Sequence, residues 1–281
     1  MVIEFCGAEA VAQGEELIER LPDHEFAIPG QLVADATITS VDHRFGAMER
    51  LEVTAVLLLL GTGVNANATL ARSKGQGGDW TVITSAWGFA VLFGVLTAVS
   101  LGAPGHINPA VTIGMAIASN EFSHVGPYIL AQLLGAMVGS GLAWLAYLPH
   151  WALTDDPAAK LGIFSTSPAI RNLPANFVSE LIGTLALLFV IVAIGSKLVA
   201  LPSYLGPVIV AFLVWGVGLS LGGSTGYAIN PARDLGPRIM HAILPIPGKG
   251  GSDWAYAWVP VGGPIAGGVI AILIARALGM I

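Results

Sequence analysis

Six long apolar stretches constrain this sequence more than any other feature. Of the residues, 54% are hydrophobic and only 11% are charged, whereas a typical soluble domain is about 25% charged. Most of the stretches approach the ~20 residues with which one helix crosses a bilayer. They lie at about 51–70, 82–101, 125–147, 176–198, 205–223 and 256–278. The sequence therefore predicts an all-α, multi-pass integral membrane protein.

Two further apolar pieces, 108–118 and 230–241, are too short to cross. Each follows an Asn-Pro-Ala tripeptide: Asn108, Pro109 and Ala110 in the first copy, and Asn230, Pro231 and Ala232 in the second. Asn is a favoured N-cap and Pro is favoured at the first helical position, so each motif predicts a helix start. The first of these helices would extend ~16 Å, which is half of a ~30 Å hydrocarbon core.

The two motifs belong to two similar halves of the chain. Repeat one, about 48–147, and repeat two, about 175–281, each contain two spans, the motif and a last span. Because three full crossings is an odd number, the second half enters the membrane from the opposite side. Inverted repeats of this kind are typical of membrane transport proteins. We expect two re-entrant half-helices that meet at their Asn-Pro-Ala ends near the midplane.

This arrangement predicts a pore. The loops before the half-helices must be extended at membrane depth, which is tolerated only along a water-filled cavity. The Asn108 and Asn230 amides would lie at its waist, where two positive half-helix ends oppose cations. The candidate pore-lining carbonyls are those of Gly105, His106, Gly226, Tyr227 and Ala228. The alternative is a pair of N-caps in ordinary re-entrant loops, but two copies at matching places favour the pore.

From about residue 50 to 281 the chain resembles the major intrinsic proteins, that is, the aquaporins and glycerol facilitators. The two motifs, the six spans and the repeat carry this resemblance. NPARDLGPR (230–238), FSTSP (164–168) and VPVGGPIAGG (259–268) further resemble the bacterial glycerol facilitators. The resemblance implies six tilted helices plus two half-helices, a homotetramer with one pore per subunit, and both termini in the cytoplasm of a bacterial-type plasma membrane.

The resemblance also implies a selectivity filter of four residues: Trp87, Gly218, Tyr227 and Arg233. Trp87 and Tyr227 would offer apolar faces to a carbon backbone, and Arg233 would offer five N–H donors to hydroxyls. Gly218 is expected to leave that wall open and wide, where a water-selective member would place a bulky His. The alternatives are a structural Arg233 paired with a carboxylate, and a Trp87 that belongs to the core or to an interfacial belt.

Two acidic residues are expected to support the second pore loop. By resemblance, Glu180 is the buried Glu that the family places in the first helix of each half. The matching position in the first half is Arg50, so the first-half partner stays open. Asp234 and Arg238 are four residues apart at a helix start, and this spacing favours a local ion pair over contact with a solute.

Residues 1–47 form an acidic extension outside the channel domain, 48–281. Residues 1–50 hold ten acidic and three basic side chains, whereas the rest of the chain holds eight and nine. The extension lacks the basic start and apolar core of a signal peptide. We expect a mobile segment, with a pattern compatible with an amphipathic helix over 8–21. A regulatory or pore-capping segment is the alternative.

The functional prediction is a passive channel for glycerol and other small neutral solutes that also passes water and excludes protons and ions. Urea, dihydroxyacetone and undissociated small acids stay open as further solutes. A mainly water-selective channel, or a junctional or structural membrane protein with a closed pore, are the alternatives. We expect no enzyme activity, cofactor, metal or nucleic-acid partner, because the sequence shows no catalytic grouping, no metal-ligand spacing and no basic patch.

Overall fold

The structure, a computed structural model, describes residues 27–28, 31–32, 47–202 and 205–281, and the side chains from residue 54 on. The chain divides into two compact units, Met1–Arg44 and Phe45–Ile281. In the first unit, strands β1 (Ala27–Ile28) and β2 (Gln31–Leu32) pair antiparallel. This hairpin was not predicted, although the intervening sequence is Pro-Gly, a dipeptide that favours turns. The predicted helix over 8–21 and the predicted mobility lie outside the described residues.

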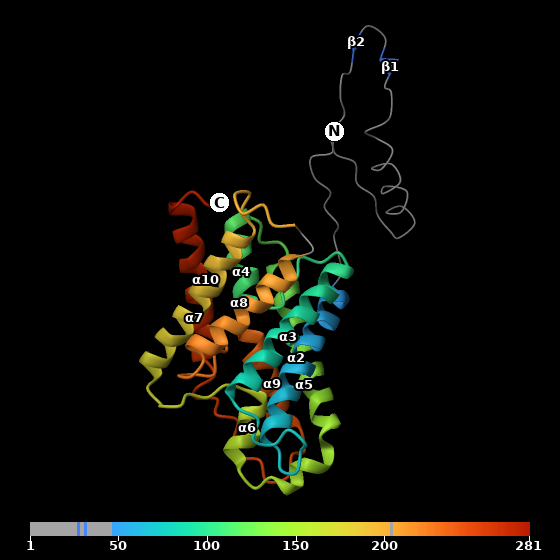
Figure 1. The fold of residues 1–281 in the computed structure, drawn as a ribbon, viewed down its shortest axis with the longest axis vertical. Helices are drawn as coiled ribbons and strands as arrows, with labels where there is room; N and C mark the ends of the chain where they lie inside the picture. The colour runs from blue at the N-terminus through green and yellow to red at the C-terminus, as the bar shows by residue number, and fades with distance from the viewer. Residues whose placement is uncertain (1–26, 29–30, 33–46, 203–204) are drawn as a thin grey trace. The chain divides into compact units, whose positions relative to one another are not determined.

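The second unit is all-α and contains two similar halves (Figure 1). Repeat one comprises α2 (Ala47–Thr69), α3 (Trp80–Ser100), α4 (Pro109–Ser119) and α5 (Val125–Ala146). Repeat two comprises α7 (Leu173–Ile194), α8 (Gly206–Leu221), α9 (Pro231–Ile243) and α10 (Val259–Ala277). The 3-10 helix η2 (Leu148–Leu153) and α6 (Pro157–Phe164) connect the halves. Helices stand at all six predicted spans, α4 and α9 stand at the two predicted half-helices, and the predicted fold is confirmed.

Within the described residues, α3, α5, α7 and α10 are long and apolar enough to cross a membrane. Helix α2, with 23 residues, and α8, with 16, occupy the other two predicted spans. Large apolar side chains point outward from this unit, and Phe89, Leu130 and Phe212 are each more than half exposed. An outer surface of this kind suits lipid, where only helices with internally satisfied backbones are stable.

Capping residues explain where helices begin. The Asp79 carboxylate accepts the backbone N–H of Val82 at 3.0 Å and so starts α3. Helix α6 was not predicted, yet its first turn is also capped by a residue next to it in the sequence. The Asp156 carboxylate accepts the N–H groups of Ala158 and Ala159, and Pro157 stands in the first turn. An Asp-Pro pair before a short apolar run was therefore the available signal.

Glycines bring the first and last helices of each half into close contact. A Cβ at Gly139 of α5 would lie 2.3 Å from the Ala55 carbonyl oxygen of α2. In repeat two, a Cβ at Gly267 of α10 would lie 2.2 Å from the Leu181 carbonyl oxygen of α7. Small residues allow such close approach of helices in membranes. The α2–α5 pair thus corresponds to the α7–α10 pair, as an internal repeat requires.

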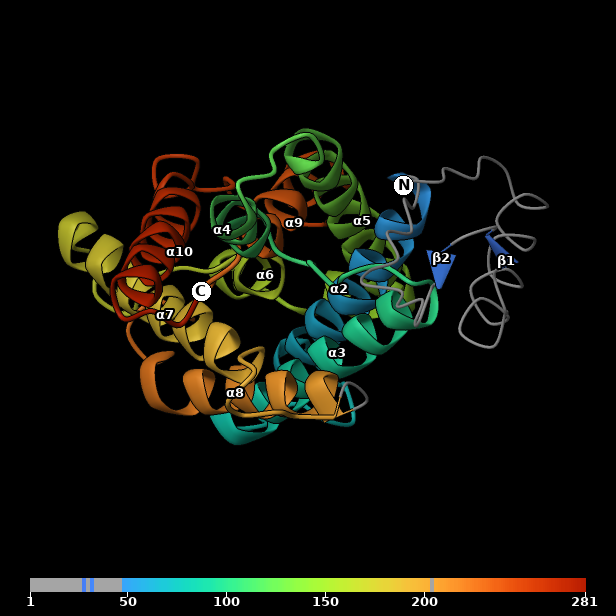
Figure 2. The ribbon, with the colours of Figure 1, turned by 90° about the horizontal axis from the view of Figure 1, so that it is seen from above.

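Viewed from above, α4 and α9 lie between α10 and α5, and α3 and α8 lie side by side where the halves meet (Figure 2). Helix α4 lies in the upper part of the second unit and α9 in the lower part (Figure 1). The half-helices therefore enter from opposite ends, as predicted. Their N-terminal ends meet inside the ring of helices, and this is where the candidate site lies.

Candidate functional site

Asn108 joins the two half-helices at the centre of the unit. Its side-chain oxygen accepts the N–H of Ala110 at 2.9 Å, which caps α4. Its amide nitrogen donates to the Ile229 carbonyl of the other half at 2.7 Å. The side chain is 5% exposed. One residue thus starts its own half-helix and also holds the loop of the other repeat.

Asn230 does the same in the opposite direction. Its oxygen accepts the N–H of Ala232 at 3.0 Å, and its amide nitrogen donates to the Ile107 carbonyl at 2.8 Å. Pro109 and Pro231 are the first residues of their helices, and the alanines that follow them are buried. The structure therefore brings the two Asn-Pro-Ala motifs together. Each Asn amide has two N–H groups, of which one serves this cross-connection.

A cavity of about 220 Å³ lies beside this junction. Eight of the predicted site residues line it: Trp87, Gly105, His106, Asn108, Tyr227, Ala228, Asn230 and Arg233. Much of the remaining wall is apolar and includes Val91, Leu187 and Val214. The other predicted site residues, Pro109, Ala110, Glu180, Gly218, Gly226, Pro231, Ala232 and Asp234, are not part of the lining. The cavity is thus apolar along most of its wall, with amide and guanidinium donors at a few points.

Arg233 and Trp87 stack on each other in this wall. The guanidinium carbon lies 4.1 Å from the centroid of the Trp87 ring, which is a cation–π contact. Arg233 is 7% exposed, and its Nη1 donates to the Phe164 carbonyl at 3.3 Å. Among the described residues, the ion pairs are made by Arg171 and Arg238. That part of the chain therefore offers no support for a structural Arg233 paired with a carboxylate.

The expectation of an open wall at Gly218 is wrong. A Cβ at Gly218 would lie 2.7 Å from Cζ of Tyr227, so the Tyr227 ring already fills the space. Trp80 secures this arrangement, because its ring packs edge-on against Tyr227 at 5.7 Å and its Nε1 donates to the Gly218 carbonyl at 3.0 Å. Gly218 therefore does not line the cavity. It provides room for the Tyr227 ring, which does line it.

The loop before α9 is strained and is held by Glu180. Tyr227 and Ile229 have positive φ angles of 38° and 42°, values that residues other than glycine rarely adopt. The two carboxylate oxygens of Glu180 accept the N–H groups of Ala228 at 3.0 Å and Ile229 at 2.8 Å. The Glu180 side chain is buried in α7. The structure thus places Glu180 where the sequence analysis proposed, while the side chain of Arg50 lies outside the described residues.

The carbonyls of the first loop have protein partners. The His106 carbonyl accepts a hydrogen bond from the side-chain amide of Gln132, which also donates to Thr112 Oγ1 at 2.9 Å. The Gly105 carbonyl accepts the N–H of Ile107 at 2.9 Å. Gln132, a buried amide in the middle of the apolar helix α5, was not among the predicted site residues. A polar residue in such a span was the available signal.

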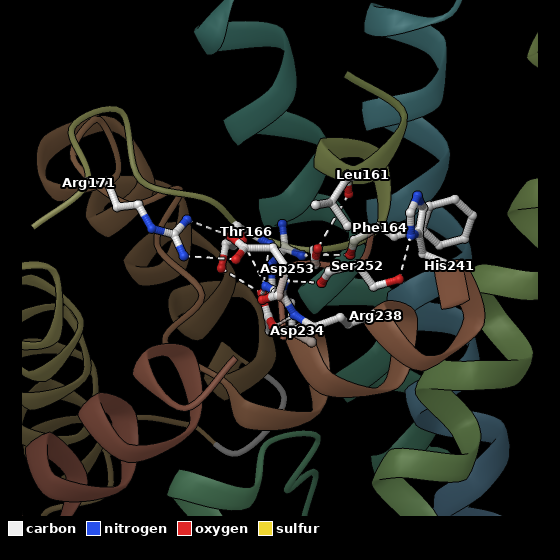
Figure 3. A network of polar contacts seen from close by, with 11 residues as sticks. Leu161, Phe164, Thr166, Arg171, Asp234, Arg238, His241, Ser252 and Asp253 are labelled. Atoms are coloured by element: carbon white, nitrogen blue, oxygen red, sulfur yellow. Dashed lines mark hydrogen bonds and ion pairs between the residues drawn. The ribbon is translucent and has the colours of Figure 1, made fainter. Parts of the chain in front are cut away.

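Asp234 is buried and lies in a network of polar contacts (Figure 3). Its carboxylate accepts hydrogen bonds from the N–H and the Oγ1 of Thr166, both at 2.7 Å. Arg238 Nε donates to the same carboxylate at 2.8 Å, which confirms the predicted local ion pair. Arg238 also donates to the Ser252 carbonyl at 2.7 Å. The network therefore ties α9 to the segment after α6 and to the loop before α10.

An inverted repeat whose half-helices meet beside a lined cavity is the architecture of a membrane transport protein. The sequence matches the Major intrinsic protein family over residues 48–275. The chain therefore belongs to this family and is an integral, multi-pass protein of the plasma membrane.

Similar proteins have related names. The chain is 55% identical over 218 residues to the "Probable glycerol uptake facilitator protein" of Thermotoga maritima, covering 77% of this chain and 92% of that protein. It is 51% identical over 226 residues to the "Glycerol uptake facilitator protein 3" of Lactiplantibacillus plantarum, covering 80% and 93%. Its fold is similar to the aquaglyceroporin from Plasmodium falciparum, with a TM-score of 0.73, 31% identity, and coverage of 82% of this chain and 93% of that one. The predicted resemblance is confirmed.

Proposed function

We propose that this chain is a passive channel for glycerol and similar small neutral solutes, and that it also passes water. The observation that carries the proposal is the placement of the Arg233 guanidinium and the Trp87 and Tyr227 rings around one apolar cavity. A polyol needs hydrogen-bond partners for its hydroxyls and tolerates apolar contact with its carbon backbone. This wall supplies both.

The energetics of desolvation support a solute of this class. Each hydroxyl that loses water without a new partner costs about 1–3 kcal/mol. A guanidinium has five N–H groups, and one of those on Arg233 donates to the Phe164 carbonyl. The others can serve as donors to the hydroxyls of a solute. Because the guanidinium is in contact with the Trp87 ring, a solute passes beside this pair and not between the two groups. We propose Trp87, Tyr227 and Arg233 as the filter, with Gly218 as the residue that admits Tyr227.

The same cavity is suited to exclude ions. The N-terminal ends of α4 and α9 meet here, and each helix end has a partial charge of about +0.5. Arg233 adds a full positive charge close to these ends. The buried carboxylates nearby, Glu180 and Asp234, are bound to backbone N–H groups and to Arg238. We therefore propose transport without chemistry and without coupling to protons.

A mainly water-conducting channel is the second candidate, and one observation favours it. The Trp87 and Tyr227 rings and the Arg233 side chain all line the cavity and restrict its width. A narrower passage favours water over a polyol. The two candidates differ in the ratio of glycerol to water permeability, which can be measured directly.

The experiment is stopped-flow light scattering on proteoliposomes that contain the full chain. We expect glycerol and water permeability well above that of empty liposomes at matched lipid composition. Glycerol permeability equal to that of empty liposomes, with water permeability raised, would establish the second candidate. Urea and dihydroxyacetone, tested in the same vesicles, would define the solute range.

We further propose a homotetramer with one pore per subunit, as the family resemblance implies. Native mass spectrometry in detergent would show a mass four times that of the chain. A monomeric mass that persists in mild detergent and in nanodiscs would contradict this assembly.

A further inference from the structure

Two residues of α2 form a seat for the Trp87 ring. Gly61 provides space, because a Cβ there would lie 2.4 Å from Cη2 and Cζ3 of Trp87. Asn65, one turn further along the same helix face, provides a partner for the indole. Its Oδ1 accepts the Trp87 Nε1–H at 3.1 Å. Trp87 and Asn65 are both buried, at 4% and 8% exposed, and a buried donor that loses its acceptor is costly.

Asn65 is itself held in a defined orientation. Its Nδ2 donates to the Ile163 carbonyl at 3.2 Å, so both ends of the amide are engaged. Ile163 is fully buried. It packs in a cluster with Ala66 of α2 and with Leu70, the residue that follows this helix. The amide therefore cannot rotate without breaking a hydrogen bond at each end. Asn65 is not part of the cavity lining, so an effect of this residue on a solute must pass through the groups that it holds.

The end of α6 links Asn65 to Arg233. Two consecutive carbonyls are involved: Ile163 accepts from Asn65, and Phe164 accepts from Arg233 Nη1 at 3.3 Å. The two stacked side chains in the wall are thus both anchored to one backbone segment, Trp87 through Asn65 and Arg233 directly. The relative position of the ring and the guanidinium depends on both anchors.

We propose that Asn65 is a positioning residue that sets solute selectivity by holding the Trp87 ring against Arg233. The inference rests on the proposed glycerol channel and extends it to a residue outside the cavity. When Asn65 cannot accept the indole N–H, the ring leaves its place in the wall. The apolar face for the carbon backbone and the stacking partner of Arg233 are then lost together. Glycerol, which needs that face, is affected more than water.

The test measures the ratio of glycerol to water permeability in proteoliposomes, which does not depend on the number of active channels. Asn65→Leu keeps the side-chain size and removes the acceptor, and we expect the ratio to fall about fivefold, equivalent to about 1 kcal/mol. Asn65→Ser, which is too short to reach the indole, should lower the ratio as well.

A double-mutant cycle separates positioning from a general structural role. Trp87→Phe removes the indole N–H, so Asn65→Leu in that background should change the ratio less than about twofold, since the two changes share one interaction. Asn176→Leu is the matched control. Among the described residues, this buried Asn of α7 binds the backbone of its own segment, through Asn172 N–H and the Ile170 carbonyl, and its loss should leave the ratio unchanged.

Three results would overturn the inference. They are an unchanged ratio in both Asn65→Leu and Asn65→Ser, an equal fall of the ratio with and without the indole, and an equal fall in Asn176→Leu. The failure of the proposed function is a different result. In that case the unmodified chain itself would show glycerol permeability no higher than that of empty liposomes.

Discussion

The carboxylate of Glu180 accepts the backbone N–H of Ile229 at 2.8 Å, across 49 residues of chain. It also binds the N–H of Ala228, and so it holds the strained loop that carries Tyr227 into the cavity wall. The buried Glu180 carboxylate therefore stabilises the fold and also positions a residue of the candidate site. The loop keeps its unfavourable φ angles only as long as this anchor is present.

Glu180→Gln replaces one accepting oxygen by a donating amide. One N–H of the loop then faces another donor, and we expect the free energy of unfolding to fall by about 1.5–3 kcal/mol, the worth of a hydrogen bond to a charged group. Thermal unfolding in detergent measures this change. Asp155→Asn, at an exposed position, is the control. Equal stability of the two variants would show that the loop does not depend on Glu180.

Arg233→Val removes the positive charge from the cavity wall. We expect protons or small cations to leak through the variant while solute flux persists, because only the half-helix ends then oppose a cation. Currents across voltage-clamped membranes measure this leak. Arg171→Val, which removes an exposed Arg outside the cavity lining, should give no current. If Arg233→Val gives none either, the guanidinium is not a significant part of the barrier.

The Arg171–Asp253 pair predicts a dependence of stability on pH. The two hydrogen bonds from the Arg171 guanidinium, each of 2.8 Å, hold the pKa of the Asp253 carboxyl below its ordinary value. A lowered pKa in the folded state stabilises the fold above the unfolded pKa of about 3.9. This stability is lost as the pH falls through the folded-state pKa. Arg171→Met should therefore lower Tm slightly at pH 7 and less below pH ~3. An equal drop at both pH values would contradict the assignment.

The acidic extension is expected to be separable from the channel. The first compact unit ends at Arg44, and the family match begins at residue 48. Deletion of residues 2–44 should leave glycerol and water permeability per channel unchanged within about twofold, since the pore residues lie in the second unit. Proteoliposomes with matched amounts of inserted protein measure this. A large loss of flux at normal insertion would make the extension part of the working channel.

The sequence predicted the parts of the site that depend on local rules. Asn108 and Asn230 could be recognised as helix starts because an N-cap followed by proline acts within a few residues. The Asp234–Arg238 pair followed from a spacing of four on a helix. These predictions needed no knowledge of tertiary packing, and the structure contains all of them.

The parts that failed depend on neighbours far apart in the chain. Gly218 was interpreted as open space because it has no side chain, but a glycine only permits approach, and Tyr227 makes that approach. The Phe164 carbonyl could not be assigned to Arg233, because it is a backbone group and its position depends on α6. Asn65 went unnoticed because a single amide in a span does not reveal which indole it will meet.

The most direct test of the filter compares two glycine variants of α8 in proteoliposomes. A Cβ at Gly218 would press on the Tyr227 ring, whereas a Cβ at Gly216 would meet nothing within 4 Å. Gly218→Ala should push the ring into the cavity and lower glycerol permeability strongly, by more than about tenfold if passage loses at least 1.4 kcal/mol. Water permeability should fall less, and Gly216→Ala should match the unmodified chain in both. A glycerol permeability in Gly218→Ala equal to that of Gly216→Ala would contradict the account, because Tyr227 would then not limit the passage of glycerol.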